Sequence, residues 1–131
     1  MDLTDAELDV LKVLWEGGPA TVRAIQAALL KRGRRWAYST VATLIQRLGV
    51  KGFVAGNSES VPHVYRALVS RAELLDRRLR DTANDLCGGN AAPLMLALVE
   101  GGGFTDEELD RFREILNKAR GGGVSRKRKG S

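Results

Sequence analysis

The chain has 131 residues, a formal net charge of +5 and a hydrophobic content of 44%. This is the size of one domain, or of a small domain with an appendage, and the apolar content excludes a wholly disordered chain. The sequence has no uninterrupted apolar run of about 18 residues and no basic-then-apolar start typical of a signal peptide. We therefore expect a cytoplasmic protein with no membrane insertion.

Metal and catalytic chemistry have few candidate residues in this sequence. Cys87 is the only cysteine and His63 the only histidine, so they form neither an intramolecular disulfide nor a closed metal site. We expect Cys87 near a helix end, with a redox or intersubunit role as the alternative, and His63 in a loop. The sequence contains no phosphate-binding glycine loop and no nucleophile with a recognisable base. We predict no enzyme activity, no cofactor and no metal.

Three amphipathic helices are predicted in the first half of the chain. The first begins at a capping box formed by Thr4 and Glu7 and ends at a Gly-Gly-Pro sequence. Thr21 is the predicted cap of the second helix, which ends at Gly33. Ser39 is expected to open the third helix, which ends at one of the glycines after residue 48.

A β-hairpin is predicted after these helices, because two short β-prone runs at residues 53–55 and 64–68 flank a turn-rich loop. Three helices followed by a hairpin are typical of a winged helix-turn-helix, in which the third helix reads DNA. The connection between the second and third helices is longer than the tightest turns of this motif.

The second half is predicted to form three further helices. Capping boxes at Ser70 and at Thr105 open the fourth and sixth, and Pro93 fits the first turn of an apolar fifth helix. All three helices are rich in apolar residues, and short helices joined by glycines cannot easily bury these residues within one chain. We therefore expect them to pack against a second copy of the chain. The alternative is that they pack onto the first half of the same chain. The residues predicted at the dimer interface are Leu75, Leu79, Leu86, Leu94, Leu96, Leu98, Leu109, Phe112 and Leu116.

The predicted fold is therefore mainly α with a small β-hairpin. A winged helix-turn-helix DNA-binding domain spans residues 1–69, a helical dimerisation domain spans residues 70–120, and a basic disordered tail spans residues 121–131. The tail either adds non-specific attraction to phosphates or serves as an inert solubilising end.

The third helix has an outward face suited to nucleic acid. Four apolar residues recur with helical spacing on one side, namely Val41, Leu44, Ile45 and Leu48. This spacing leaves Ser39, Thr43 and Gln46 on the opposite side. No acidic residue occurs between Glu16 and Glu59, whereas this stretch holds seven lysines and arginines. Such a block predicts a focused positive field around the helix.

We assign roles on this face by side-chain chemistry. Gln46 suits an adenine edge, Thr43 or Ala42 suits a thymine methyl, and Arg47 suits a phosphate that sets the register. The wing is a weaker candidate, because its tip carries an acid and no basic residue. The residues predicted to contact DNA are Arg34, Arg35, Tyr38, Ser39, Thr40, Ala42, Thr43, Gln46, Arg47 and Arg66.

Several segments of the chain match a known family. They are Leu3-Thr-Asp-Ala-Glu-Leu-Asp-Val-Leu-Lys-Val-Leu-Trp15, Thr40-Val-Ala-Thr-Leu-Ile-Gln-Arg-Leu48 with Lys51-Gly52, and Thr105-Asp-Glu-Glu-Leu-Asp-Arg-Phe-Arg-Glu-Ile-Leu116. Together they resemble the penicillinase-repressor family of bacteria, which includes methicillin-resistance repressors. The resemblance implies a winged-helix homodimer that binds a palindromic operator in double-stranded DNA, with Thr40, Thr43, Gln46 and Arg47 on the DNA face.

The chain departs from this family where derepression is concerned. Some members are cleaved at an Asn-Phe bond, and Ala97-Leu98 stands at the matching place here. Copper-responsive members have a Cys-x-Cys motif, which a chain with one cysteine lacks. A regulatory membrane sensor or protease is a further partner that the resemblance suggests, but the inducing signal stays open. Overall we predict a sequence-specific repressor; the alternative is a winged-helix protein-interaction module without sequence-specific DNA binding.

Overall fold

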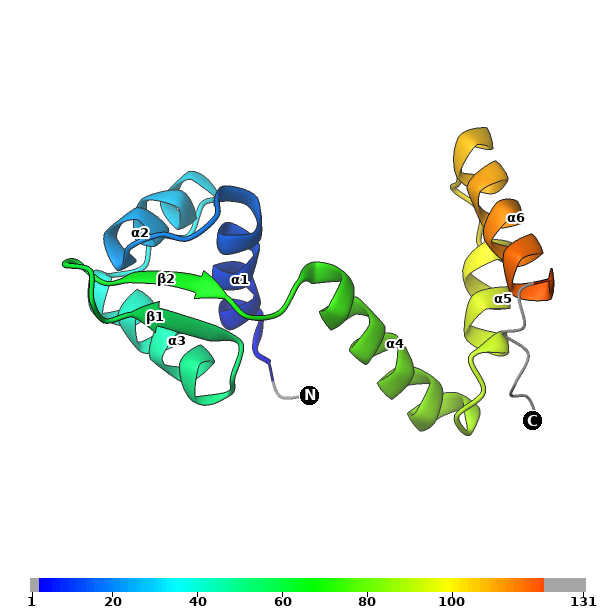
Figure 1. The fold of residues 1–131 in the computed structure, drawn as a ribbon, viewed down its shortest axis with the longest axis horizontal. Helices are drawn as coiled ribbons and strands as arrows, with labels where there is room; N and C mark the ends of the chain where they lie inside the picture. Colours follow the sequence, from blue (N-terminus) through cyan, green and yellow to red (C-terminus); the bar gives the residue numbers. More distant parts are fainter. Residues whose placement is uncertain (1–2, 122–131) are drawn as a thin grey trace. The chain divides into compact units, whose positions relative to one another are not determined.

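The computed structural model describes residues 3–121, whose contacts divide the chain into one unit up to Gly89 and another from Asn90 onward. The described residues form six helices and one two-stranded hairpin (Figure 1). Their bounds are α1 (Asp5–Gly17), α2 (Val22–Lys31), α3 (Tyr38–Val50), β1 (Val54–Asn57), β2 (Val64–Ala67), α4 (Arg71–Cys87), α5 (Ala92–Glu100) and α6 (Asp106–Gly121). The predicted mainly α fold with a small hairpin is confirmed.

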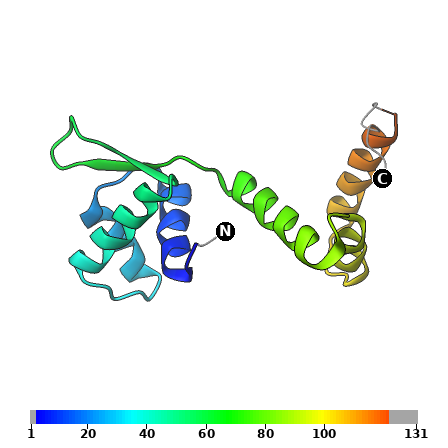
Figure 2. The ribbon, with the colours of Figure 1, turned by 90° about the horizontal axis from the view of Figure 1, so that it is seen from below.

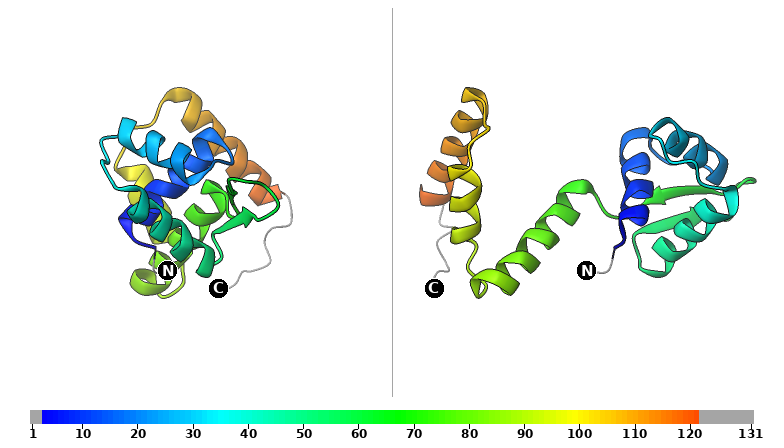
Figure 3. Two further views of the ribbon diagram at one scale, coloured as in Figure 1. Left: turned by 90° about the vertical axis from the view of Figure 1, so that its left-hand side faces the viewer. Right: turned by 180° about the vertical axis from the view of Figure 1, so that it is seen from behind.

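A winged helix-turn-helix forms most of the first unit. The helices α1, α2 and α3 contact one another, and the hairpin runs alongside them (Figures 2 and 3). The two strands pair antiparallel, with Val54 opposite Ala67 and Asn57 opposite Val64. Two backbone hydrogen bonds between Ala20 and Tyr65, of 2.9 and 2.8 Å, also tie the start of α2 to the hairpin.

The core of this unit lies where the apolar sides of the three helices meet. All four residues predicted on the inner side of α3 are buried, namely Val41, Leu44, Ile45 and Leu48. Val10 in α1 is also fully buried, although it was not among the residues predicted in the core. Leu74 joins the same cluster from α4, so that the first turns of this helix continue the core.

The helix caps follow the sequence closely, with one exception. Capping boxes form as predicted at Thr4, Ser70 and Thr105. In the first, the backbone N–H of Thr4 donates to the Glu7 carboxylate at 2.9 Å, and the Thr4 hydroxyl accepts a hydrogen bond from the backbone N–H of Glu7. The prediction that Ser39 opens α3 is wrong. The helix begins at Tyr38 with Ala37 as its N-cap, and no side chain caps it.

The second unit contains α5 and α6, neither of which has a buried residue. Phe104 and Phe112 stack edge to face at 5.0 Å between ring centroids, which ties the start of α6 to the turn before it.

No helix in the described part of the chain is long and apolar enough to cross a membrane. The basic residues of the predicted tail lie outside the described residues. The contacts group α4 with the first unit, whereas the predicted dimerisation domain begins at residue 70; that boundary stays a prediction.

Candidate nucleic-acid interface

The outward side of α3 presents the predicted reading residues to solvent. Ser39, Thr43 and Gln46 are exposed and follow one another at spacings of four and three residues, which places them on one stripe of the helix. Nine of the ten residues predicted to contact DNA are exposed, and Ala42 is half-buried. α3 contributes seven of these ten, the connection before it contributes Arg34 and Arg35, and β2 contributes Arg66.

The positive field around α3 is smaller than the sequence predicts, because the fold brings the acids of α1 against the acid-free block. Arg32 forms an ion pair with Glu16, and Arg34 forms one with Asp9 at 2.8 Å. Lys51 forms a third, with Glu7, at 2.7 Å. Three of the seven cations between Glu16 and Glu59 are therefore neutralised within the fold.

Other basic groups beside α3 stay available to a partner. No carboxylate among residues 3–121 lies within ion-pair distance of Arg35 or Arg47. The guanidinium of Arg23 lies 5.6 Å from the ring centroid of Tyr38, which places an α2 cation next to the first residue of α3. Arg23 is one of the seven cations of the acid-free block, but it is not among the residues predicted to contact DNA. Its position at the start of α2 is the signal that could have identified it.

Arg34 has two partners besides solvent. Its guanidinium contacts Asp9 and also lies 5.5 Å from the ring centroid of Trp36. The backbone carbonyl of Trp36 in turn accepts a hydrogen bond of 3.1 Å from Gln26. The long connection between α2 and α3 is thus held to both α1 and α2, which fixes where α3 begins.

The far end of α3 is fixed by a buried carboxylate. Glu7 has no solvent-exposed surface, and its Oε1 accepts hydrogen bonds from Lys51 Nζ and from the Thr4 backbone. Burial alone would raise the pKa of Glu7, but these two hydrogen bonds outweigh it and hold the pKa below its ordinary value. Lys51 is the C-cap residue of α3, so this ion pair joins the end of α3 to the first turn of α1.

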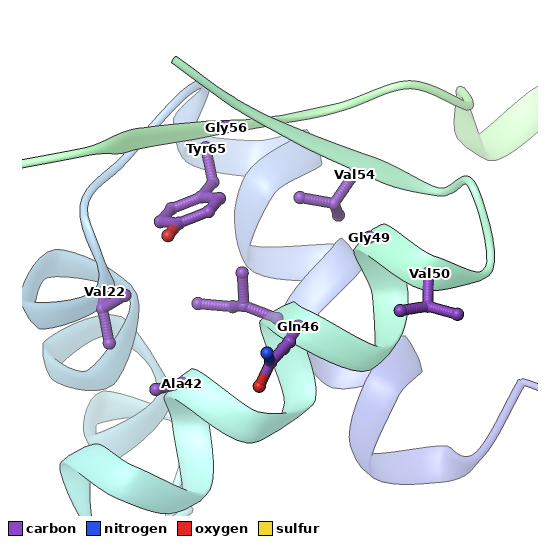
Figure 4. A pocket seen from close by; sticks show the side chains of 9 residues that line it. Val22, Ala42, Gln46, Gly49, Val50, Val54, Gly56 and Tyr65 are labelled. Atoms are coloured by element: carbon purple, nitrogen blue, oxygen red, sulfur yellow. The ribbon is translucent and has the colours of Figure 1, made fainter. Parts of the chain in front are cut away.

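A hollow of about 510 Å³ lies between α2, α3 and the hairpin. Figure 4 shows Val22 and Tyr65 on one side of it, with Gln46 and Val50 projecting from α3 on the other. The hollow has no charged side chain in its lining. Within the hairpin, the Tyr65 ring of β2 packs so closely over Gly56 of β1 that a Cβ on Gly56 would lie 2.8 Å from the ring. Val50 is not among the residues predicted to contact DNA.

The residues predicted to mediate dimerisation are mostly uncovered. Among them the most exposed are Leu86, at 80%, and Leu116, at 64%. Leu79, Leu94 and Phe112 are half-buried, and the other predicted interface residues are exposed. Each unit therefore exposes apolar side chains of its own, from α4 in the first unit and from α5 and α6 in the second, and these are candidate interaction surfaces.

Known proteins resemble this chain along most of its length. The penicillinase repressor family model matches residues 3–118. The methicillin resistance regulatory protein MecI of Mammaliicoccus sciuri is 27% identical over 117 residues, which cover 89% of this chain and 94% of that protein. The penicillinase repressor of Bacillus licheniformis is 24% identical over 116 residues, which cover 88% and 90%. A solved structure of a MarR family protein from Bacillus stearothermophilus aligns with 95% of this chain and 78% of its own, with a TM-score of 0.48 and 24% identity. Because the family model matches well over half of the residues, the chain belongs to the penicillinase repressor family.

Proposed function

We propose that the protein is a homodimeric transcriptional repressor that binds a palindromic operator and blocks a promoter by occupying it. The observation that carries this proposal is the outward stripe of α3. Hydroxyl and amide groups that suit base edges stand there, with Arg47 beside them, Arg35 in the connection before the helix and no acid among them. Membership of the penicillinase repressor family supports DNA-binding repression as the general activity.

The homodimer is supported by the uncovered apolar side chains of α4, α5 and α6. The two described helices of the second unit contain no buried residue and form no core between them, so a partner surface is needed to stabilise them. A second copy is the simplest partner, because a two-fold axis lets the same leucines cover one another. Two reading helices related by that axis would face two half-sites about one or more helical turns apart.

The proposal is tested with the full-length protein and DNA recovered from a random-sequence duplex pool. We expect a palindromic sequence to be enriched and to bind two chains per duplex. Its affinity should exceed that of a scrambled duplex by at least about a thousandfold. The logarithm of the binding constant should fall with the logarithm of salt concentration, by about 0.9 for each phosphate neutralised.

Equal affinity for recovered and scrambled duplexes would contradict sequence-specific reading and favour the protein-interaction module. One chain per duplex would contradict the homodimer on DNA. A regulatory membrane sensor or protease as a partner, and a cytoplasmic location, stay predictions. The first follows from the family resemblance, and the second from the lack of a long apolar run and of a signal-peptide pattern in the sequence.

A further inference from the structure

Val50 extends the reading stripe of α3 by one further turn. It follows Gln46 by four residues, so Ser39, Thr43, Gln46 and Val50 stand in one line at spacings of four, three and four. The side chain of Val50 is 86% exposed, which is more than almost any other large apolar residue in the described chain. The polar stripe therefore ends in two uncovered methyl groups.

Hollows on both sides of Gln46 and Val50 leave the C-terminal end of α3 exposed. The hollow of about 510 Å³ borders Gln46 and Val50 on the side of the hairpin (Figure 4). A second hollow, of about 380 Å³, borders the same two residues on the side of Thr43 and Lys51. Gln46 and Val50 thus form a ridge, the reading ridge, that no other described part of the chain covers.

The surroundings of the reading ridge fit DNA rather than an apolar protein surface. Thr43 and Arg47 lie beside it, and no carboxylate pairs with Arg47 among the described residues. A positively charged and hydrogen-bonding face attracts the phosphate backbone and the base edges. The only apolar group that a base pair offers in the major groove is the C5-methyl group of thymine.

We propose that Val50 is a specificity-determining residue that contacts a thymine methyl group in each half-site. The distance along α3 from Gln46 to Val50 is about 6 Å, or roughly two base-pair steps, so this thymine lies close to the base read by Gln46. The inference rests on the proposed function, because it requires α3 to enter the major groove of an operator.

The test uses the duplex recovered from the random pool, remade with one thymine at a time replaced by deoxyuridine. This replacement removes only the methyl group. For the wild-type protein we expect one position in each half-site at which deoxyuridine lowers affinity about fourfold, the equivalent of one buried methyl group. Val50→Ala should bind the thymine duplex about fourfold more weakly than the wild type does. Replacing that thymine with deoxyuridine should then cause no further loss of affinity in the variant.

Val61→Ala is the matched control, because Val61 is 93% exposed and lies in the hairpin loop, outside α3. It should retain the full response to deoxyuridine. Both valines are exposed, so neither variant should change the unfolding midpoint. If Val50→Ala responds to deoxyuridine as the wild type does at every thymine, the methyl is read by another residue and the inference is wrong. A wild-type protein that does not distinguish the recovered duplex from a scrambled one would instead refute the proposed function itself.

Discussion

Lys51 Nζ lies 2.7 Å from Oε1 of Glu7, a carboxylate with no solvent-exposed surface, although the two residues are 44 positions apart in sequence. The other carboxylate oxygen of Glu7 has no hydrogen-bond partner among the described residues. The pair holds the last turn of α3 to α1, so its loss should affect both stability and the placement of α3.

The two partners of this ion pair should differ in what their removal costs. Lys51→Met leaves a buried carboxylate without its cation and should lower the free energy of unfolding by about 3–5 kcal/mol. Glu7→Gln leaves only a partly exposed ammonium, which water can solvate, and should cost about 1–3 kcal/mol. Urea unfolding at neutral pH measures both. Equal losses, or a larger loss for Glu7→Gln, would contradict the burial of the charge on Glu7.

Acid should weaken the wild-type protein more than the Glu7→Gln variant. The pKa of Glu7 lies below its ordinary value of 4.5 in the folded state, since the Lys51 and Thr4 hydrogen bonds outweigh the effect of burial. The contribution of ionised Glu7 to the free energy of unfolding is therefore fully present at pH values above 4.5 and is lost as the pH falls toward the lowered pKa. Urea midpoints from about pH 6 to about pH 3 should converge for the two proteins. Other carboxylates with lowered pKa values, such as Glu16 and Glu73, affect both proteins alike.

Gln46 and Arg47 should separate specificity from affinity. Gln46→Ala should cost about 1–3 kcal/mol on the recovered palindrome and relax selection at one base pair in each half-site. Arg47→Ala should weaken binding to recovered and scrambled duplexes by similar factors, because phosphates are the same in both. Fluorescence anisotropy with the two duplexes gives this comparison. If Gln46→Ala weakened binding to both duplexes equally, Gln46 would contact the DNA backbone rather than a base.

Arg34 and Arg35 are neighbours in sequence but should act differently on DNA. Arg34 is already paired with Asp9 and lies over Trp36, whereas no described carboxylate pairs with Arg35. Arg35→Ala should therefore reduce the salt-dependence slope of DNA binding by about one. Arg34→Ala should leave that slope unchanged and lower the thermal unfolding midpoint. A smaller slope for Arg34→Ala would mean that phosphate displaces Asp9 on binding.

Local sequence patterns were enough to predict the helices, the hairpin and most caps. Periodicity identifies the inner side of α3, and a capping box reports contacts within three residues of each other. The start of α3 was misplaced because Ser39 is a good capping residue, while Ala37 takes the N-cap position with no side-chain bond. Capping chemistry therefore does not mark this boundary in the sequence.

Long-range pairing could not be predicted from the same patterns. Glu7 reads as a capping residue, and nothing near it in sequence shows that Lys51 will reach it from the end of α3. The pairing of Arg34 with Asp9 is hidden for the same reason, so the positive field was overestimated. Val50, by contrast, lies on the periodic stripe and could have been found by continuing the spacing one turn further.

The apolar surface of α6 gives a final prediction about assembly. Leu116 is 64% exposed and belongs to the predicted dimer interface, so an aspartate there would place a charge inside the contact between two copies. Leu116→Asp should shift sedimentation from dimer to monomer and weaken binding to a full palindrome much more than to a single half-site. Leu30→Asp is the matched control, since Leu30 is 53% exposed on α2, and it should stay dimeric. A Leu116→Asp protein that sediments as the wild-type dimer would exclude this residue from the interface, because a buried aspartate without a partner is too costly to be tolerated there.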